Sequence, residues 1–282
     1  MSLGETAHAS DQVQRMDDVC ALSMVHRIAA MLDLDTGKYA EGDALPHGWH
    51  VGLFGIHTRD SELRPDGVAG FGVQLPDVGL PRVVMGGRRT QFLGEIPIGA
   101  PVTRFTRVES VTPKEGRTGR IAIASVVHHI FASDPANPVI IEHQDYVFRE
   151  AADKAASASA APTAAPQPTE APIVHERTPN EIMLFRYCAI QANPHRIHYD
   201  YPYATGVEGY RALIVNGGLA ALLLTETFRA EAGREPAVVS SRNNGLLYCN
   251  EVIRLKAQPG DPAWRLWAED ETGRRAVEAT IE

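Results

Sequence analysis

The chain has 282 residues, of which 44% are hydrophobic, so it can bury a sizeable core and global disorder is excluded. Its formal net charge is −8 and its basic residues do not cluster, which argues against nucleic-acid binding. The three cysteines, Cys20, Cys188 and Cys249, are far apart and form no Cys-x-x-Cys pattern, as is typical of a reducing cytoplasm without structural disulfides.

No segment predicts export or insertion into a membrane. Residues 1–10 lack the basic start and the apolar core of a signal peptide. The longest apolar run, at residues 219–224, ends at Thr225 and Glu226 and is too short to cross a bilayer. We therefore expect a cytoplasmic protein that has neither a membrane nor a nucleic acid as its partner.

The N-terminal part of the chain predicts helix first and then strands. Residues 16–34 carry apolar side chains at helical spacing, and the glycine- and aromatic-rich residues 48–58 predict a short, interrupted helix. After Pro81 the chain becomes rich in β-forming residues, in runs separated by turn residues. Strands are expected at residues 83–92, 102–111, 120–131 and 139–148.

A change in composition divides the chain into two halves. Residues 151–172 are nearly all alanine, serine, proline and threonine and contain no aromatic residue. Such a segment buries little apolar surface, so it is predicted to be a linker. The expected domains are residues 1–150 and residues 173–282.

The C-terminal half repeats the order of the first. Residues 180–192 predict a helix, with the sequence TPN at residues 178–180 as its cap, and residues 219–230 predict a second helix that is apolar on most faces and hence buried. Helix followed by antiparallel sheet, occurring twice, predicts an α+β tandem repeat. Strands are expected at residues 237–248, 251–257, 264–269 and 276–281.

A polar loop at residues 193–200 separates the two C-terminal helices. His198 is the main candidate for a general base, because neutral imidazole accepts a proton near pH 7. Asn193 can orient a water or the substrate, while Tyr187 and Arg196 are close in sequence and are candidate substrate contacts. His195 is the rival base or the group that orients His198, and a purely structural histidine is the alternative for either one.

The second buried helix begins with two glycines, Gly217 and Gly218. Glycine lets a ligand approach the backbone closely, and free N–H groups at a helix start stabilise an oxygen that gains negative charge. The alternative is that these glycines only allow the helix to pack tightly on a sheet. A loop base followed by such a helix can act on a carbonyl compound.

Several arginines are candidates for binding a phosphate or a carboxylate, but each alone is more typical of a surface residue. They are Arg186, Arg196, Arg211 and Arg242. The sequence GGRR at residues 86–89 resembles a phosphate-binding turn only superficially, because it lies inside a predicted strand.

We expect neither a metal nor a cofactor. His195 and His198 are too weak a pair for a metal site, and no cluster of acidic residues and histidines completes a ligand set. The sequence also contains no serine nucleophile elbow, no Walker motif and no dinucleotide-binding fingerprint.

The polar loop and the glycine helix start together resemble a known family, the MaoC-like dehydratases. Residues 185–200 are similar to the hydratase motif of that family, and IVNG at residues 214–217 is similar to the IVHG start of its central helix. Residues 45–50 and 114–119 resemble one branch, which contains mitochondrial-type 3-hydroxyacyl-thioester dehydratases and bacterial mesaconyl-CoA and itaconyl-CoA hydratases.

The resemblance implies an α+β double hotdog, in which each repeat is a long helix wrapped by an antiparallel sheet and an acyl-CoA lies between the halves. The N-terminal half, which lacks the motif, would bind substrate and the C-terminal half would catalyse. The motif histidine corresponds to His198, the motif aspartate to Asn193, the motif asparagine to His195 and the oxyanion glycine to Gly217. Asn216, where the family has histidine, and Gly218 are expected to contact substrate.

Two departures from the family pattern limit the mechanism. Asn193 cannot take a proton, so a scheme with two bases fails, although the branch named above also has asparagine there. Asn216 replaces the histidine of the IVHG motif. We expect a hydro-lyase that reversibly hydrates a 2,3-enoyl-CoA thioester, with the CoA thioester as substrate and no further cofactor.

The expected acyl group is short and carries a second carboxylate, as in mesaconyl-CoA or itaconyl-CoA. A homodimer is expected from the resemblance only. Two alternatives stay open at this point. A hotdog thioesterase would need a carboxylate base, and the first acidic residue in the loop is Asp200. A non-catalytic acyl-CoA-binding protein would bind CoA esters without turnover.

Overall fold

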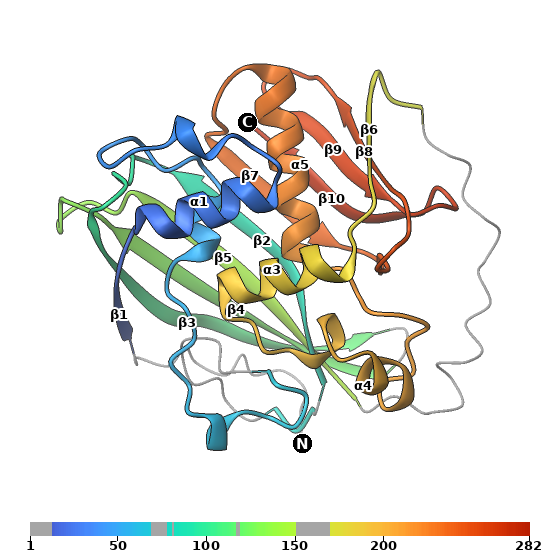
Figure 1. Cartoon of the computed structure of the whole chain (residues 1–282). Coiled ribbons are helices and arrows are strands. Elements are labelled where there is room, and N and C mark those ends of the chain that lie inside the picture. The colour runs from blue at the N-terminus through green and yellow to red at the C-terminus, as the bar shows by residue number, and fades with distance from the viewer. Residues whose placement is uncertain (1–12, 69–77, 81, 117–118, 151–169) are drawn as a thin grey trace.

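The computed structural model describes residues 13–68, 78–80, 82–116, 119–150 and 170–282. One curved antiparallel sheet of ten strands forms a continuous layer, and the helices α1, α3 and α5 lie on one face of it (Figure 1). The strand order is β1-β3-β4-β5-β2-β7-β10-β9-β8-β6, so β2 and β7 join the two halves of the chain.

The strands of the two halves lie on either side of this junction. Alternating buried and exposed positions along β4 and β5 show one face packed on the core. The N-terminal strands are β1 (Gln14–Val19), β2 (Arg82–Phe92), β3 (Pro101–Gly116), β4 (Gly119–Phe131) and β5 (Ile140–Arg149). The C-terminal strands are β6 (Ile173–Arg177), β7 (Val238–Asn243), β8 (Ile253–Gln258), β9 (Trp264–Glu269) and β10 (Arg275–Ile281).

The helices differ in length between the two halves. The helix α5 (Gly217–Ala232) has 16 residues and packs on β7, β8, β9 and β10, whereas α1 (Leu22–Met31) has 10 residues. α3 (Glu181–Gln191) contacts α1, and α4 (Tyr201–Gly206) follows it. The 3₁₀ turns among the described residues are η1 (Thr36–Lys38), η2 (Trp49–Gly52), η3 (Asp60–Glu62) and η4 (Arg196–His198).

The predicted α+β double-hotdog fold is confirmed, and the strand predictions are close to the observed bounds. The helix predicted at residues 16–34 is wrong at its start, because Met16 to Val19 belong to β1 and the helix begins at Leu22. Backbone hydrogen bonds to β3 decide this, since they pair Gln14–Val19 with residues 101–106 in a way that no local pattern reveals. The strand predicted at residues 237–248 ends at Asn243, and β6 was not predicted.

Most of the predicted linker, residues 151–172, falls outside the described residues, and β6 begins at Ile173. The domain boundaries therefore stay a prediction. A single large hydrophobic core nevertheless spans both halves, because Val25 and Ile28 of α1 and Leu219 and Leu224 of α5 belong to it. No described helix is long and apolar enough to cross a membrane.

Candidate active site

The polar loop between α3 and α5 is held by local caps and one ion pair. Asn180 caps α3 by accepting a hydrogen bond from the Met183 N–H at 2.9 Å. The helix ends at Gln191, and its C-cap residue Ala192, with a φ of 49°, turns the chain into the loop. Asp200 then caps α4 through the Tyr203 N–H and accepts hydrogen bonds from Arg196 at 2.8 and 2.9 Å.

His198 lies in η4 and is buried, with 7% of its surface exposed. Its Nδ1 is 2.8 Å from the carbonyl oxygen of Ile214. A carbonyl only accepts, so Nδ1 carries the proton and Nε2 keeps its lone pair. Burial lowers the pKa of His198 to about 3, so the ring is neutral at pH 7. A neutral imidazole held in one tautomer is suited to accept a proton through Nε2.

The other two loop candidates lie next to this histidine in the chain and in space. The rings of His195 and His198 meet edge to face with their centroids 5.4 Å apart. Asn193 accepts a hydrogen bond from the His195 N–H through Oδ1 at 3.0 Å, which leaves its Nδ2 group as the donor that can hold a water. The His195 ring therefore lies beside that of His198, and Asn193 is bonded to the His195 backbone. The separate roles of these three residues stay predictions.

The start of α5 follows directly on the strand-like segment that holds His198. Ile214 is two residues before Asn216, the N-cap residue of α5. The side chain of Asn216 caps no N–H among the described residues and instead lies against Cys188, with Nδ2 3.6 Å from Sγ. Gly217 and Gly218 form the first turn, so their N–H groups are available to a ligand oxygen.

Arg196 is engaged within the protein, which matters for its predicted contact with substrate. Besides its bonds to Asp200, it donates to the Pro65 carbonyl at 3.2 Å and stacks 3.9 Å from the Tyr203 ring centroid. These contacts stabilise the loop. A direct contact between Arg196 and substrate stays a prediction.

Comparison with known proteins gives the family. The family model for hydroxyacyl-thioester dehydratase type 2 matches residues 48–249. The chain is also 35% identical to the mesaconyl-C(4)-CoA hydratase of Chloroflexus aurantiacus over 278 residues, which cover 97% of this chain and 95% of that protein. This chain belongs to the hydroxyacyl-thioester dehydratase type 2 family. It is a hydro-lyase of the enoyl-CoA hydratase/dehydratase kind, as the resemblance implied.

A shorter match links the chain to the same family in yeast. The mitochondrial hydroxyacyl-thioester dehydratase type 2 of Schizosaccharomyces pombe is 43% identical over 53 residues, which cover 19% of this chain and 18% of that protein.

Solved structures agree on the fold. HtdX of Mycobacterium tuberculosis has a TM-score of 0.66 at 17% identity and covers 96% of this chain and 99% of its own. A MaoC-like dehydratase from Phytophthora capsici has a TM-score of 0.70 at 13% identity and covers 100% of this chain and 97% of its own. A further M. tuberculosis protein with a double hotdog fold has a TM-score of 0.60 at 13% identity, covering 98% of this chain and 95% of its own.

Tyr187 of α3 faces the start of α5 in this dehydratase-family chain. The residue is 0% exposed, and its hydroxyl is a buried polar atom without a hydrogen-bond partner among the described residues. A Cβ placed on Gly218 would lie 2.5 Å from this hydroxyl but 3.5 Å from the ring carbon that carries it. The hydroxyl therefore lies directly beside the helix start.

We expect Gly218→Ala to destabilise the protein and Tyr187→Phe to relieve most of that effect. Overpacking of this kind costs about 1–3 kcal/mol, whereas the double variant leaves only ring contacts at 3.5 and 3.8 Å. Urea unfolding of the two single variants and the double variant measures the coupling. Additive free energies in the double variant would contradict the placement of the hydroxyl.

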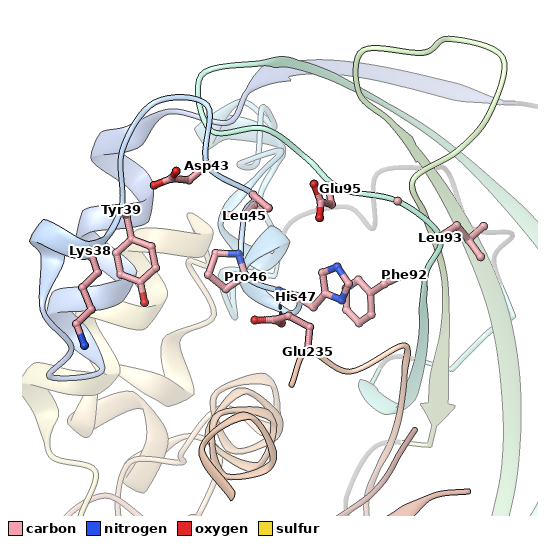
Figure 2. Close-up of a pocket in the computed structure, with 12 residues that line it drawn as sticks. Lys38, Tyr39, Asp43, Leu45, Pro46, His47, Phe92, Leu93, Glu95 and Glu235 are labelled. Atoms are coloured by element: carbon pink, nitrogen blue, oxygen red, sulfur yellow. Dashed lines mark hydrogen bonds between the residues drawn. The ribbon is translucent and has the colours of Figure 1, made fainter. Parts of the chain in front are cut away.

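A cavity of about 640 Å³ lies elsewhere, near the other end of α5 (Figure 2). Glu235, which follows α5, and His47, whose ring stacks on Phe92 with centroids 4.2 Å apart, are among its lining residues. A helix of 16 residues is about 24 Å long. The cavity therefore lies away from Gly217 and His198 and is not the candidate active site.

The inner face of the N-terminal half carries buried polar residues that sequence reasoning missed. Thr106, His128, Glu142 and Thr90 are paired side by side across β3, β4, β5 and β2, and each is buried. Glu142 accepts hydrogen bonds from Thr90 at 2.8 Å, and its Oε2 is 2.9 Å from His50 Nε2. We call these four strand residues the polar row.

The polar row occupies inward-facing positions of the sheet. Polar residues at alternate positions of the predicted strands lie on one face of a sheet, and this pattern in the sequence could have predicted the polar row. No group of three or more potential metal ligands is found among the residues that the structure describes. The expectation that neither a metal nor a cofactor takes part stays a prediction.

Proposed function

We propose that this hydro-lyase acts on a short 2,3-enoyl-CoA whose acyl group carries a second carboxylate, as in mesaconyl-CoA. The observation that carries the reaction is a neutral, buried His198, fixed by the Ile214 carbonyl two residues before the N-cap of α5. The 35% identity with the mesaconyl-C(4)-CoA hydratase along nearly the whole chain supports an acyl group with a second carboxylate.

The mechanism that we propose uses one base. Nε2 of His198 takes a proton from a water that the Asn193 amide positions, and the water oxygen bonds to C3 of the enoyl group. The electron pair of the double bond moves toward the thioester oxygen, which the Gly217 N–H stabilises. The imidazolium then gives its proton to C2, and the reverse sequence dehydrates the 3-hydroxyacyl-CoA.

Burial helps the second proton transfer. The pKa of His198 is lowered to about 3, because burial disfavours the charged ring. An imidazolium formed in this place is a strong acid, so it returns its proton readily. The remaining site residues would contact substrate: Tyr187, His195, Arg196, Asn216 and Gly218.

The geometry disfavours the thioesterase alternative. Such an enzyme would need a carboxylate base, and Asp200 is the acidic residue of the loop. Both of its oxygens are engaged, Oδ1 with the Tyr203 N–H and Oδ2 with Arg196. The hydrogen bond from Arg196 and, to a smaller extent, that from the Tyr203 N–H lower the pKa of Asp200. The carboxylate is therefore a poor proton acceptor.

A panel of substrates tests the proposed function. We expect mesaconyl-CoA or itaconyl-CoA to be hydrated faster than crotonyl-CoA and than a long-chain enoyl-CoA. Loss of the enoyl absorbance would follow the rate, and mass spectrometry would identify the water adduct. Faster turnover of crotonyl-CoA would contradict the proposal that the acyl group carries a second carboxylate. Release of free CoA would indicate a thioesterase.

We also propose that the enzyme is a cytoplasmic homodimer that needs no cofactor. Support for the dimer comes from the resemblance to hotdog proteins, which often pair across their sheets. The three scattered cysteines support a reducing compartment.

A further inference from the structure

One arginine lies against the carboxylate of the polar row, and a second acts on it electrostatically. Arg88 of β2 has Nε 3.5 Å from Glu142 Oε1, and its side chain is 17% exposed. Arg104 of β3 also acts electrostatically on Glu142 and, more weakly, on Asp18. Within the described part of the chain, the Nε atoms of both arginines are buried without a hydrogen-bond partner.

Burial and the neighbouring Arg88 decide which groups of this cluster are charged. The nearby His128 is neutral at pH 7, because burial lowers its pKa to about 4. The pKa of Glu142 lies well below its ordinary value despite burial, because Arg88 and His50 stabilise the carboxylate. Arg88 therefore lies against Glu142, whereas the Arg104 guanidinium lies 4.8 Å from the Phe54 ring centroid and acts on Glu142 only electrostatically. Buried cations need compensation by an anion or by strong hydrogen bonds.

The cluster is connected to the start of α5. The Tyr187 hydroxyl lies beside Gly218. Burial raises the pKa of this hydroxyl, and the positive charge of Arg88 acts in the opposite direction. A second contact links β2 to the start of α5. The side chain of Asn243 in β7 lies against Gly217 and donates a hydrogen bond to the Met85 carbonyl of β2 at 3.0 Å. Arg88 is three residues further along the same strand, on the face that carries Gln144 and Thr90.

We infer that Arg88, with the hydroxyl of Tyr187, binds the free carboxylate of the acyl group. The inference rests on the proposed function, which places the thioester oxygen at Gly217. In a short dicarboxylic acyl group the second carboxylate is only a few bonds from that oxygen. Neither the Nε of Arg88 nor the Tyr187 hydroxyl has a hydrogen-bond partner among the described residues, and both are donors of the kind that a carboxylate accepts. Arg104 adds positive charge from the other side of Glu142.

The competing explanation is structural: Arg88 would only neutralise Glu142. A selectivity ratio separates the two explanations, because mesaconyl-C4-CoA and 3-methylcrotonyl-CoA differ in having a carboxylate or a methyl at C3. A structural role would change the kcat/KM of both substrates alike. A binding role would change the ratio between them.

The decisive variant is the double substitution Arg88→Met with Glu142→Gln, which removes both members of the Arg88–Glu142 ion pair, so that neither is left facing the other's vacant place. We expect the ratio of kcat/KM for mesaconyl-C4-CoA over 3-methylcrotonyl-CoA to fall about 100-fold or more, in line with the loss of a buried charge-assisted contact. Arg88→Lys is a second variant that keeps the charge but loses the planar fork, and we expect a smaller fall in the ratio.

The matched control is Arg89→Gln. Arg89 follows Arg88 in β2, is exposed on the opposite side of the strand and donates to Ser240 Oγ at 2.9 Å. The Arg89→Gln variant should have the same ratio of kcat/KM for mesaconyl-C4-CoA over 3-methylcrotonyl-CoA as the wild type. If the wild type prefers dicarboxylic substrates and both Arg88 variants keep that preference, the inference alone is overturned. If the wild type prefers 3-methylcrotonyl-CoA, the proposed acyl group is overturned together with the inference.

Discussion

Replacement of His198 by alanine is expected to lower kcat for enoyl-CoA hydration by about 10²- to 10⁴-fold, the usual range for a general base. The reason is that Nε2 of this ring is the unprotonated nitrogen, since Nδ1 donates to the Ile214 carbonyl. Steady-state hydration of mesaconyl-CoA measures the loss. Circular dichroism and thermal melting show whether the variant is folded.

The control is His195→Ala, which removes the neighbouring ring but not the proposed base. We expect its loss in kcat to be much smaller. If kcat falls strongly in His195→Ala and only slightly in His198→Ala, His195 rather than His198 is the general base.

The pH dependence gives an independent check on His198. Burial disfavours the charged ring, so its pKa is lowered to about 3 and the ring is neutral, with Nε2 unprotonated, from pH 5 upward. Protonation of His198 therefore removes no activity between pH 8 and pH 5 in the free enzyme. A fall in kcat/KM centred near the ordinary histidine pKa, about 6.5, would indicate a more exposed base.

The second large effect concerns Gly217, the first residue of α5. A Cβ at this position would lie 2.6 Å from Oδ1 and 2.8 Å from Cγ of Asn243, closer than real Cβ contacts. Asn243 cannot move easily, because its Nδ2 donates to the Met85 carbonyl. We expect Gly217→Ala to displace the helix start and its N–H donor, and to lower kcat by about 10²- to 10³-fold, as loss of an oxyanion donor does.

Two further variants test whether the loss of activity in Gly217→Ala comes from the steric conflict with Asn243. Gly206→Ala at the end of α4 is the control, since a Cβ there meets no described atom within 4 Å, and its activity should be unchanged. Gly217→Ala combined with Asn243→Ala removes the steric conflict and should recover part of the lost kcat. If Gly217→Ala alone keeps nearly full activity, the N–H at this helix start is not the oxyanion donor.

Local patterns in the sequence predicted much of the fold. The strand predicted at residues 264–269 has the bounds of β9, because alternating and aromatic residues between turns are a local signal. Asn180 was predicted within the cap of α3 for a similar reason: a side chain that bonds the N–H three residues later needs no distant partner.

Predictions failed where pairing between distant segments decides the structure. Residues 16–19 have helical spacing of apolar side chains, yet they pair with β3. β6 pairs with β8, about which residues 173–177 carry no information. The continuous sheet arises from the pairing of β2 with β7 across the two halves, a contact that no local pattern contains.

For the candidate active site, the sequence by itself determined the order of the segments: a polar loop with Asn193, His195 and His198, followed by two glycines at a helix start. The catalytic roles of these residues stay predictions. The tertiary structure decided which nitrogen of His198 keeps its lone pair, because that depends on the Ile214 carbonyl 16 residues away. It also placed Arg88, a residue inside a predicted strand, with its Nε 3.5 Å from Glu142 Oε1 of the neighbouring strand. Sheet register and burial set these properties, and both depend on contacts between segments that are far apart in the chain.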